Sequence, residues 1–214
     1  MTTWATPGGP SATERAATRL DRWYGWADAA AYVGLLNLLI IAFTLAGGVV
    51  LGWAPALAAA ASCSRTRLRG DTQRLVRAFA TRWRRDFLHA NLLVAPTAAA
   101  LTGLGLGLLT ADGPRALQIG LWAAAAACVA HLVLVLNMDA HYELRRVQCA
   151  LLAWTFLVRF PGAPLLLIAT TALTTALCAF VPGLVPVVAV GTWTHLCTAL
   201  CLSFFAANDR NVAA

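Results

Sequence analysis

The chain has 214 residues, of which 60% are hydrophobic and only 12% are charged, and its formal net charge is +7. A soluble domain carries about 25% charged residues, so this composition excludes an ordinary soluble protein. All sixteen basic residues are arginines, and half of them lie between Arg65 and Arg85. Arginine-rich loops next to membrane spans stay on the cytoplasmic side, which explains the positive charge without nucleic acid as a partner. The sequence predicts an all-α, polytopic transmembrane helix bundle.

Four long tracts without charge follow one another along the chain, at residues 29–64, 87–110, 116–138 and 160–208. A bilayer core takes about 20 apolar helical residues per crossing, so each of the two middle tracts predicts one span. The last tract is long enough for two spans, with Pro182 and Gly183 as the turn between them. We expect a single transmembrane domain over residues 13–208, between a flexible N-terminal tail (1–12) and a C-terminal tail (209–214).

The first tract is too long for one span, and Gly47 and Gly48 divide it. In one interpretation, residues 29–46 and 49–64 both cross the bilayer, giving six spans with both termini inside. In the other, residues 55–69 lie along the cytoplasmic surface, giving five spans and an external N-terminus. Six spans put fifteen arginines inside and Arg115 alone outside, whereas five spans put twelve inside and four outside. The positive-inside rule therefore favours six spans, with five as the alternative.

Two amphipathic basic segments, residues 71–87 and 141–160, are predicted to form elbow helices on the cytoplasmic face. At 100° per residue, Leu75, Phe79 and Trp83 share one side of the first elbow, opposite most of its arginines. Such a helix can lie at the headgroup level and bind anionic phospholipids or a partner. The plainer interpretation is an anchor for topology with solvated charges. The candidate lipid-binding or partner-binding residues are Arg74, Arg77, Arg82, Arg84, Arg85, Arg145 and Arg146.

Asp86 falls on the apolar side of the first elbow. An unpaired carboxylate in such surroundings is costly, so we expect Asp86 to be a buried structural residue with a basic partner. Arg145, Arg146 or Arg159 of the second elbow would pair with it best, because that pair would tie the two elbows together.

Polar residues also occur inside the predicted spans, at Asn37, Asn91, His131 and His195. Polar groups in lipid usually face the interior of a bundle. They could form hydrogen bonds between helices or line a path for a substrate, and the first interpretation is favoured.

The sequence offers few other candidates for a catalytic or metal-binding site. Asn137 and His141 lie on the opposite helix face from Asp139 and Glu143, so the four cannot converge on one metal. His195 likewise points away from Cys197 and Cys201. We therefore assign no catalytic residues, no metal site and no cofactor, and we expect a protein that is not an enzyme.

Four short stretches together resemble the YesL-like bacterial membrane proteins, a family of unknown function. They are LLNLL at 35–39, LGWAPALAAA at 51–60, RAFATRWRRDFLHANLL at 77–93 and LRRVQCALLAW at 144–154. The chain departs from the family pattern at Ala54, Leu57 and Asp86, where glycine, threonine and asparagine are common. The resemblance carries no catalytic residues over. It implies a link to carbohydrate ABC importers, because members of the family are often encoded beside such genes.

Two classes of function follow from this sequence. The first is a non-enzymatic accessory or assembly subunit of a carbohydrate ABC importer. The alternative is a small stand-alone or oligomeric transporter or channel for a small solute. We expect a multi-pass protein of the bacterial cytoplasmic (inner) membrane. Its expected partners are the lipid bilayer and anionic phospholipids, with ABC transporter subunits and further copies of this chain as candidates.

Overall fold

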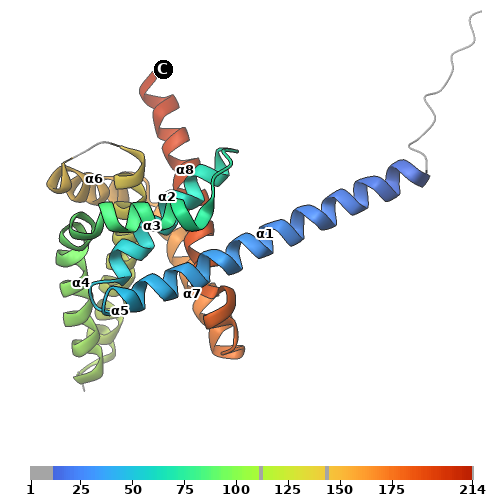
Figure 1. Cartoon of the computed structure of the whole chain (residues 1–214). Coiled ribbons are helices and arrows are strands. Elements are labelled where there is room, and N and C mark those ends of the chain that lie inside the picture. The colour runs from blue at the N-terminus through green and yellow to red at the C-terminus, as the bar shows by residue number, and fades with distance from the viewer. Residues whose placement is uncertain (1–11, 111–112, 143–144, 214) are drawn as a thin grey trace, which may run out of the picture.

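The computed structural model describes residues 12–110, 113–142 and 145–213, with side chains described between residues 23 and 210. Within these ranges every regular element is a helix, as the sequence predicted (Figure 1). The helices are α1 (Ala12–Ala46), α2 (Trp53–Leu68), α3 (Leu75–Arg85), α4 (Phe87–Thr110), α5 (Arg115–His141), α6 (Arg146–Arg159), α7 (Gly162–Phe180) and α8 (Val190–Ala213), with a π-helical segment η1 (Val185–Ala189) leading into α8.

The two predicted tails relate to this description in different ways. Residues 1–11 of the N-terminal tail lie outside the described residues, and α1 already begins at Ala12. At the other end, α8 runs on to Ala213, so most of the segment assigned to a C-terminal tail is helical.

Five of the described helical segments are long and apolar enough to cross a membrane. They are Trp23–Ala46, Phe87–Thr110, Arg115–His141, Gly162–Phe180 and Val185–Arg210. The chain is therefore an integral membrane protein. These five are candidate spans by length and composition, one fewer than the six spans that the arginine distribution favoured.

Helix α2 explains the difference, because it replaces the expected second span. It has 16 residues, which is about 24 Å at 1.5 Å per residue and shorter than a bilayer core. Nor does it lie along a surface, as the five-span interpretation required. Its alanine-rich face is buried against α1, α4, α5 and α8, because small side chains let helix backbones approach closely.

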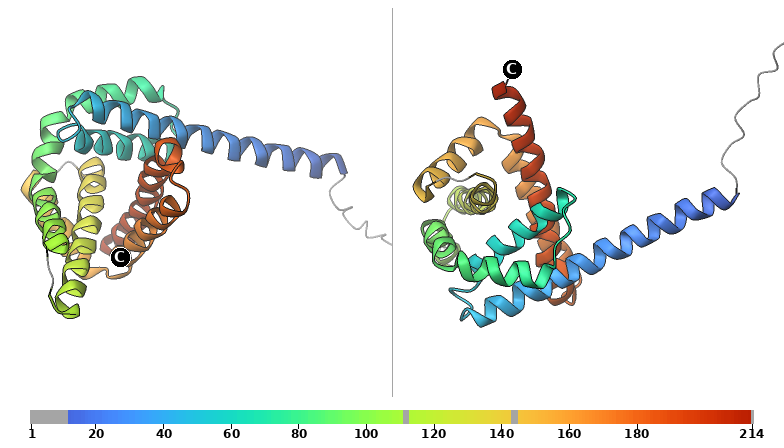
Figure 2. Two further views of the ribbon diagram at one scale, coloured as in Figure 1. Left: turned by 90° about the horizontal axis from the view of Figure 1, so that it is seen from below. Right: turned by 45° about the horizontal axis from the view of Figure 1, so that its top comes forward.

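The helices form two groups, one of α1 to α3 and the other of α4 to α8, which meet at α2 and α5. Figure 2 (left) shows α1, α2 and α3 lying together across the helix pairs α4–α5 and α7–α8. Helix α1 runs across the other candidate spans, and its N-terminal half extends well beyond them (Figure 1). One buried core surrounds Leu36 and Phe79, and a second surrounds Leu134 and Phe205. Helix α5 contributes residues to both cores and so joins them.

Glycine permits two close backbone contacts that set this arrangement. A Cβ atom on Gly52 would lie 2.3 Å from the Thr44 carbonyl oxygen, so the turn from α1 into α2 closes only with glycine there. On Gly191 of α8, a Cβ atom would lie 2.5 Å from the Val33 carbonyl oxygen and 2.9 Å from the Asn37 amide nitrogen of α1. Helices α1 and α8 thus touch backbone to backbone.

We expect the Gly191→Ala variant to be destabilised, because its methyl group would meet main chain that cannot rotate away. Overpacking of this kind costs about 1–3 kcal/mol, which corresponds to a fall in Tm of roughly 2–12 °C for a chain of this size. The matched control is Gly120→Ala, where a Cβ atom meets nothing within 4 Å. That variant should melt at or above the parent Tm, because alanine favours helix. Equal Tm values for both variants in detergent would contradict the close contact.

We also expect the N-terminus to lie on the same side of the membrane as the arginine-rich loop. Asp28 of α1 pairs with Arg67 of α2 at 2.6 Å, and at the other end Gly47 packs beside Trp83 of α3. Both ends of the apolar part of α1 therefore lie near arginine-bearing segments. A cysteine introduced at Ser11 should stay unlabelled by an impermeant thiol reagent in intact cells and react after lysis. The parent chain is the blank, and strong labelling of intact cells would place the N-terminus outside.

Candidate functional site

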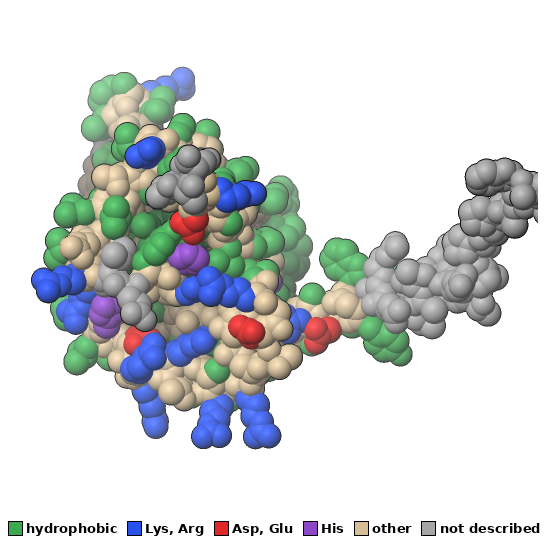
Figure 3. Space-filling model, turned by 90° about the horizontal axis from the view of Figure 1, so that it is seen from above, with side chains coloured by type: hydrophobic (Ala, Val, Ile, Leu, Met, Phe, Trp, Pro, Cys, Tyr) green, Lys and Arg blue, Asp and Glu red, His purple; other side chains and the backbone are tan. Residues whose placement is uncertain are grey.

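The most prominent polar feature of the molecule is a group of outward-facing arginines, here termed the arginine surface. It comprises Arg74, Arg77, Arg84 and Arg85 around α3, and Arg145 and Arg146 at the start of α6, all of them exposed. Figure 3 shows basic side chains gathered over one face of the molecule, with few acidic side chains among them. Among the described residues, none provides a hydrogen-bond or ion-pair partner for Arg74, Arg77, Arg84 or Arg145.

Helix α3 faces its arginines outward because its opposite side is occupied. Phe79 is fully buried, and its ring centroid lies 5.2 Å from that of Phe43 of α1. Trp83 packs on the same Phe43 ring at 5.2 Å and on Phe87 at 4.9 Å. A helix of this kind can place its apolar side on lipid, but here that side packs against α1 and α2. The arginines are therefore held on a helix with a fixed orientation.

Helix α6 differs from α3 because several of its large apolar side chains are exposed. Cys149, Ala153 and Phe156 face the core, while Val147 and Val158 are 70% and 81% exposed. Burial raises the pKa of the Cys149 thiol to about 12, so it stays protonated and donates to the Val135 carbonyl oxygen at 3.6 Å. The exposed apolar stripe of α6 suits contact with lipid. Both elbows are basic and amphipathic. The first buries its apolar side in the protein, whereas the second leaves an apolar stripe exposed.

Arg82 does not belong to the arginine surface, although the sequence placed it there. Its guanidinium donates to the Thr66 hydroxyl at 3.1 Å and to the Cys63 sulfur at 3.4 Å. Both partners lie in the last turns of α2. Arg82 therefore holds α3 against α2 and is half-buried.

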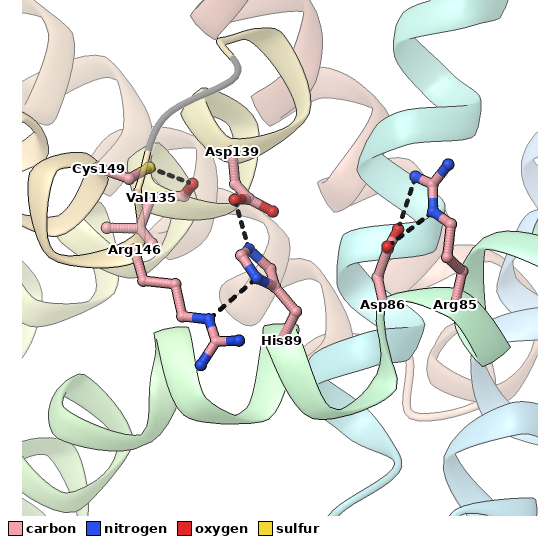
Figure 4. Close-up of polar contacts among 7 residues, drawn as sticks. All are labelled: Arg85, Asp86, His89, Val135, Asp139, Arg146 and Cys149. Atoms are coloured by element: carbon pink, nitrogen blue, oxygen red, sulfur yellow. Dashed lines mark hydrogen bonds and ion pairs between the residues drawn. The ribbon is translucent and has the colours of Figure 1, made fainter.

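The prediction for Asp86 is wrong both in its partner and in its burial. Asp86 accepts from the adjacent Arg85 at 2.9 Å and 3.1 Å, and its side chain is 34% exposed. Through these hydrogen bonds and its charge, it raises the pKa of the Arg85 guanidinium. Asp86 lies between α3 and α4, and Figure 4 shows its carboxylate turned toward Arg85 and not toward Arg146.

The second elbow is joined to α4 and α5 through His89, which the sequence did not single out. His89 Nε2 lies 2.8 Å from the Asp139 carboxylate of α5, and Arg146 Nε of α6 donates to His89 Nδ1 at 3.0 Å (Figure 4). Because Arg146 can only donate, Nδ1 must accept. Nε2 therefore carries the hydrogen and donates it in the hydrogen bond to the Asp139 carboxylate. One imidazole thus connects α4, α5 and α6.

Asn37 is fully buried and binds main-chain groups where the chain passes from η1 into α8. Its Nδ2 donates to the carbonyl oxygens of Pro186 at 2.7 Å and Val185 at 3.3 Å. Its Oδ1 accepts from the Gly191 amide at 2.9 Å. Lipid cannot satisfy such groups, so this side chain stabilises the junction where α1 crosses α8.

Asn91 and His131 are engaged in the same way. Asn91 donates to the Leu51 carbonyl in the α1–α2 turn at 2.9 Å. His131 lies between the Thr97 hydroxyl at 3.0 Å and the Ala150 carbonyl at 3.1 Å, and its ring stacks on Trp154. All three side chains join helices to each other.

His195 differs from these residues. Its ring meets Tyr32 of α1 edge-on at 5.5 Å. Its Nδ1, the Tyr32 hydroxyl and the Ser64 hydroxyl are buried without a hydrogen-bond partner among the described residues. The four polar residues predicted inside the spans therefore do not converge on one place.

The remaining polar residues do not assemble into a metal site within the described part of the chain, where no three His, Cys, Asp or Glu residues are grouped suitably. Asn137 bonds to the Val133 carbonyl of its own helix at 2.8 Å, and Asp139 binds His89. Glu143 lies outside the described residues.

We expect the adjacent residues Arg145 and Arg146 to respond differently to replacement by glutamine. Arg146→Gln removes the hydrogen bond to His89 and should lower stability by about 0.5–1 kcal/mol, a fall in Tm of roughly 1–4 °C. Arg145→Gln, the matched control, should melt like the parent. In a His89→Phe background, the effect of Arg146→Gln should disappear. An unchanged effect in that background would show that the bond to His89 does not stabilise the fold.

Comparison with known proteins gives one partial match. Residues 33–108, about a third of the chain, match the family model described as "Protein of unknown function, DUF624". No curated protein matches the chain, and no solved structure does. The matched segment runs from the apolar part of α1 through α4 and contains three of the four stretches on which the YesL-like resemblance rests. Over α1 to α4, the chain is therefore similar to a family of unknown function, which is consistent with that resemblance.

Proposed function

We propose that this protein is a non-enzymatic accessory or assembly subunit, which binds a partner in the same membrane through the arginine surface. The YesL-like resemblance suggests the class of partner, a carbohydrate ABC importer of a bacterial cytoplasmic membrane.

This proposal rests on a contrast between the polar residues inside the spans and the arginines on the basic face. Inside the spans, Asn37, Asn91 and His131 use their hydrogen-bonding groups to join helices. On the basic face, Arg74, Arg77 and Arg84 extend outward from a helix whose other side is packed on α1 and α2. Polar groups engaged in joining helices suit a scaffold, and charges held on a fixed helix suit recognition of an acidic surface.

The same contrast argues against the alternative of a stand-alone transporter or channel. A solute path needs polar side chains that face a common space and can exchange partners with the solute. Asn37 and His131 are instead buried to 0% and 3% exposure and bound to main-chain or side-chain groups. The proposal that the chain is not an enzyme rests on the same engagement of Asn37, Asn91 and His131.

We expect the combined replacement of Arg74, Arg77, Arg84 and Arg85 by glutamine to abolish co-purification of a stoichiometric partner from native membranes. The matched control replaces the same four arginines by lysine, which keeps the charge and should retain most of the partner. The measurement is quantitative mass spectrometry of a tagged protein isolated in mild detergent, at low and high salt. Both variants should keep the parent Tm within a few degrees, since the first three arginines lack bonded partners among the described residues.

Three results would contradict the proposal. The first is a glutamine variant that retains its partner as the parent does. The second is solute flux into liposomes that contain this protein alone, which would favour the transporter. The third is retention of anionic vesicles without any protein partner, which would reduce the arginine surface to a lipid anchor.

A further inference from the structure

A hollow of about 590 Å³ lies between α5, α6 and α8, outside the arginine surface. Its base is apolar and aromatic, with Met138, Phe156, Phe160 and Phe205 among the lining residues. Its rim is polar, with Tyr142, Arg159 and Asp209. The rim residues stand at the ends of the three helices, so the hollow passes from an apolar interior to a charged edge.

The base is a fixed apolar surface. The Phe156 ring centroid lies 4.8 Å from that of Phe160 and 5.7 Å from that of Phe205, in the second case edge to face. Phe205 is almost completely buried, and it also packs on the ring of His141 at 5.1 Å. A base of packed rings suits a hydrocarbon chain, which gains contact area and needs no hydrogen bonds.

The rim carries one charge of each sign. Arg159 is the last residue of α6, is exposed, and has no bonded partner among the described residues. Asp209 accepts a hydrogen bond from the Tyr142 hydroxyl at 3.1 Å through Oδ1, which leaves Oδ2 available. Burial, together with the hydrogen bond to Asp209, raises the pKa of Tyr142, so its hydroxyl stays a donor and holds the carboxylate in place.

We propose that this hollow binds one phospholipid with an ethanolamine headgroup. One acyl chain lies on the phenylalanine rings, the phosphate accepts from the Arg159 guanidinium, and the headgroup ammonium donates to the Asp209 carboxylate. Arginine is well matched to phosphate, and charge-assisted hydrogen bonds are the strong ones.

The pair of charges on the rim selects among headgroups. Phosphatidylglycerol offers the phosphate but no cation for Asp209. Phosphatidylcholine offers a cation whose methyl groups leave no N–H donor for the carboxylate. Both therefore lose one charge-assisted hydrogen bond, which corresponds to about tenfold in affinity. This site is independent of the proposed accessory function, which uses other arginines.

The test is native mass spectrometry of the full chain in mild detergent, titrated with the palmitoyl-oleoyl forms of phosphatidylethanolamine, phosphatidylglycerol and phosphatidylcholine. The parent should bind the ethanolamine lipid about tenfold more tightly than either of the others. Arg159→Gln should weaken all three lipids, and Asp209→Asn should remove only the preference for ethanolamine. Arg210→Gln is the matched control, because Arg210 does not line the hollow and its Nε bonds to the Ala206 carbonyl at 3.1 Å.

The comparison of the three lipids on the parent protein decides the proposal even if a variant fails to fold. Equal binding of the three, or tightest binding of phosphatidylglycerol, would overturn it. So would an Arg210→Gln variant that loses lipid as strongly as Arg159→Gln.

Discussion

The crossing of α1 and α8 at Gly191 is the contact on which the rest of the helix arrangement depends. Main chain meets main chain there, because glycine leaves no side chain between the helices. Asn37 adds three hydrogen bonds to the same place and so satisfies groups that lipid would leave unpaired. With α1 fixed across α8, the short helix α2 returns between α1, α4, α5 and α8 and fills the centre with small side chains.

This central hairpin also fixes where the charges lie. Arg67, at the end of α2, pairs with Asp28 and lies 4.2 Å over the Tyr32 ring. Arg82 binds back to the last turns of α2. Among the other arginines of α3, Arg77 and Arg84 have no bonded partner among the described residues, and Arg85 pairs only with its neighbour Asp86. All three face outward. The arginine run is therefore divided into two by the packing, with some residues that hold the helices together and others that meet the surroundings.

The sequence was sufficient for the fold class and for both elbows, because composition and the 3.6-residue period report directly on helices and on their apolar sides. It was not sufficient for the span count. An alanine-rich tract has the same hydropathy pattern whether it faces lipid or the protein. Only its contacts with α4, α5 and α8 show that α2 is central. The prediction for Asp86 failed for a different reason. It placed the partner in the other elbow, whereas the carboxylate binds the adjacent Arg85. His89 was missed because its partners, Asp139 and Arg146, are 50 and 57 residues away. A histidine in the first turn of a span is the only local signal of that site.

The long separation between Asn37 and its partners has a consequence for biosynthesis. Pro186, which receives the shortest of the Asn37 hydrogen bonds, is 149 residues further along the chain. At about 5–20 residues per second, roughly 7–30 seconds pass between synthesis of the two. During that time α1 and α2 are already made, but Asn37 has no lasting partner and the buried side of α2 has no α8 to cover it. The Asn37 amide of the nascent hairpin therefore stays without its final hydrogen bonds until the last helix arrives.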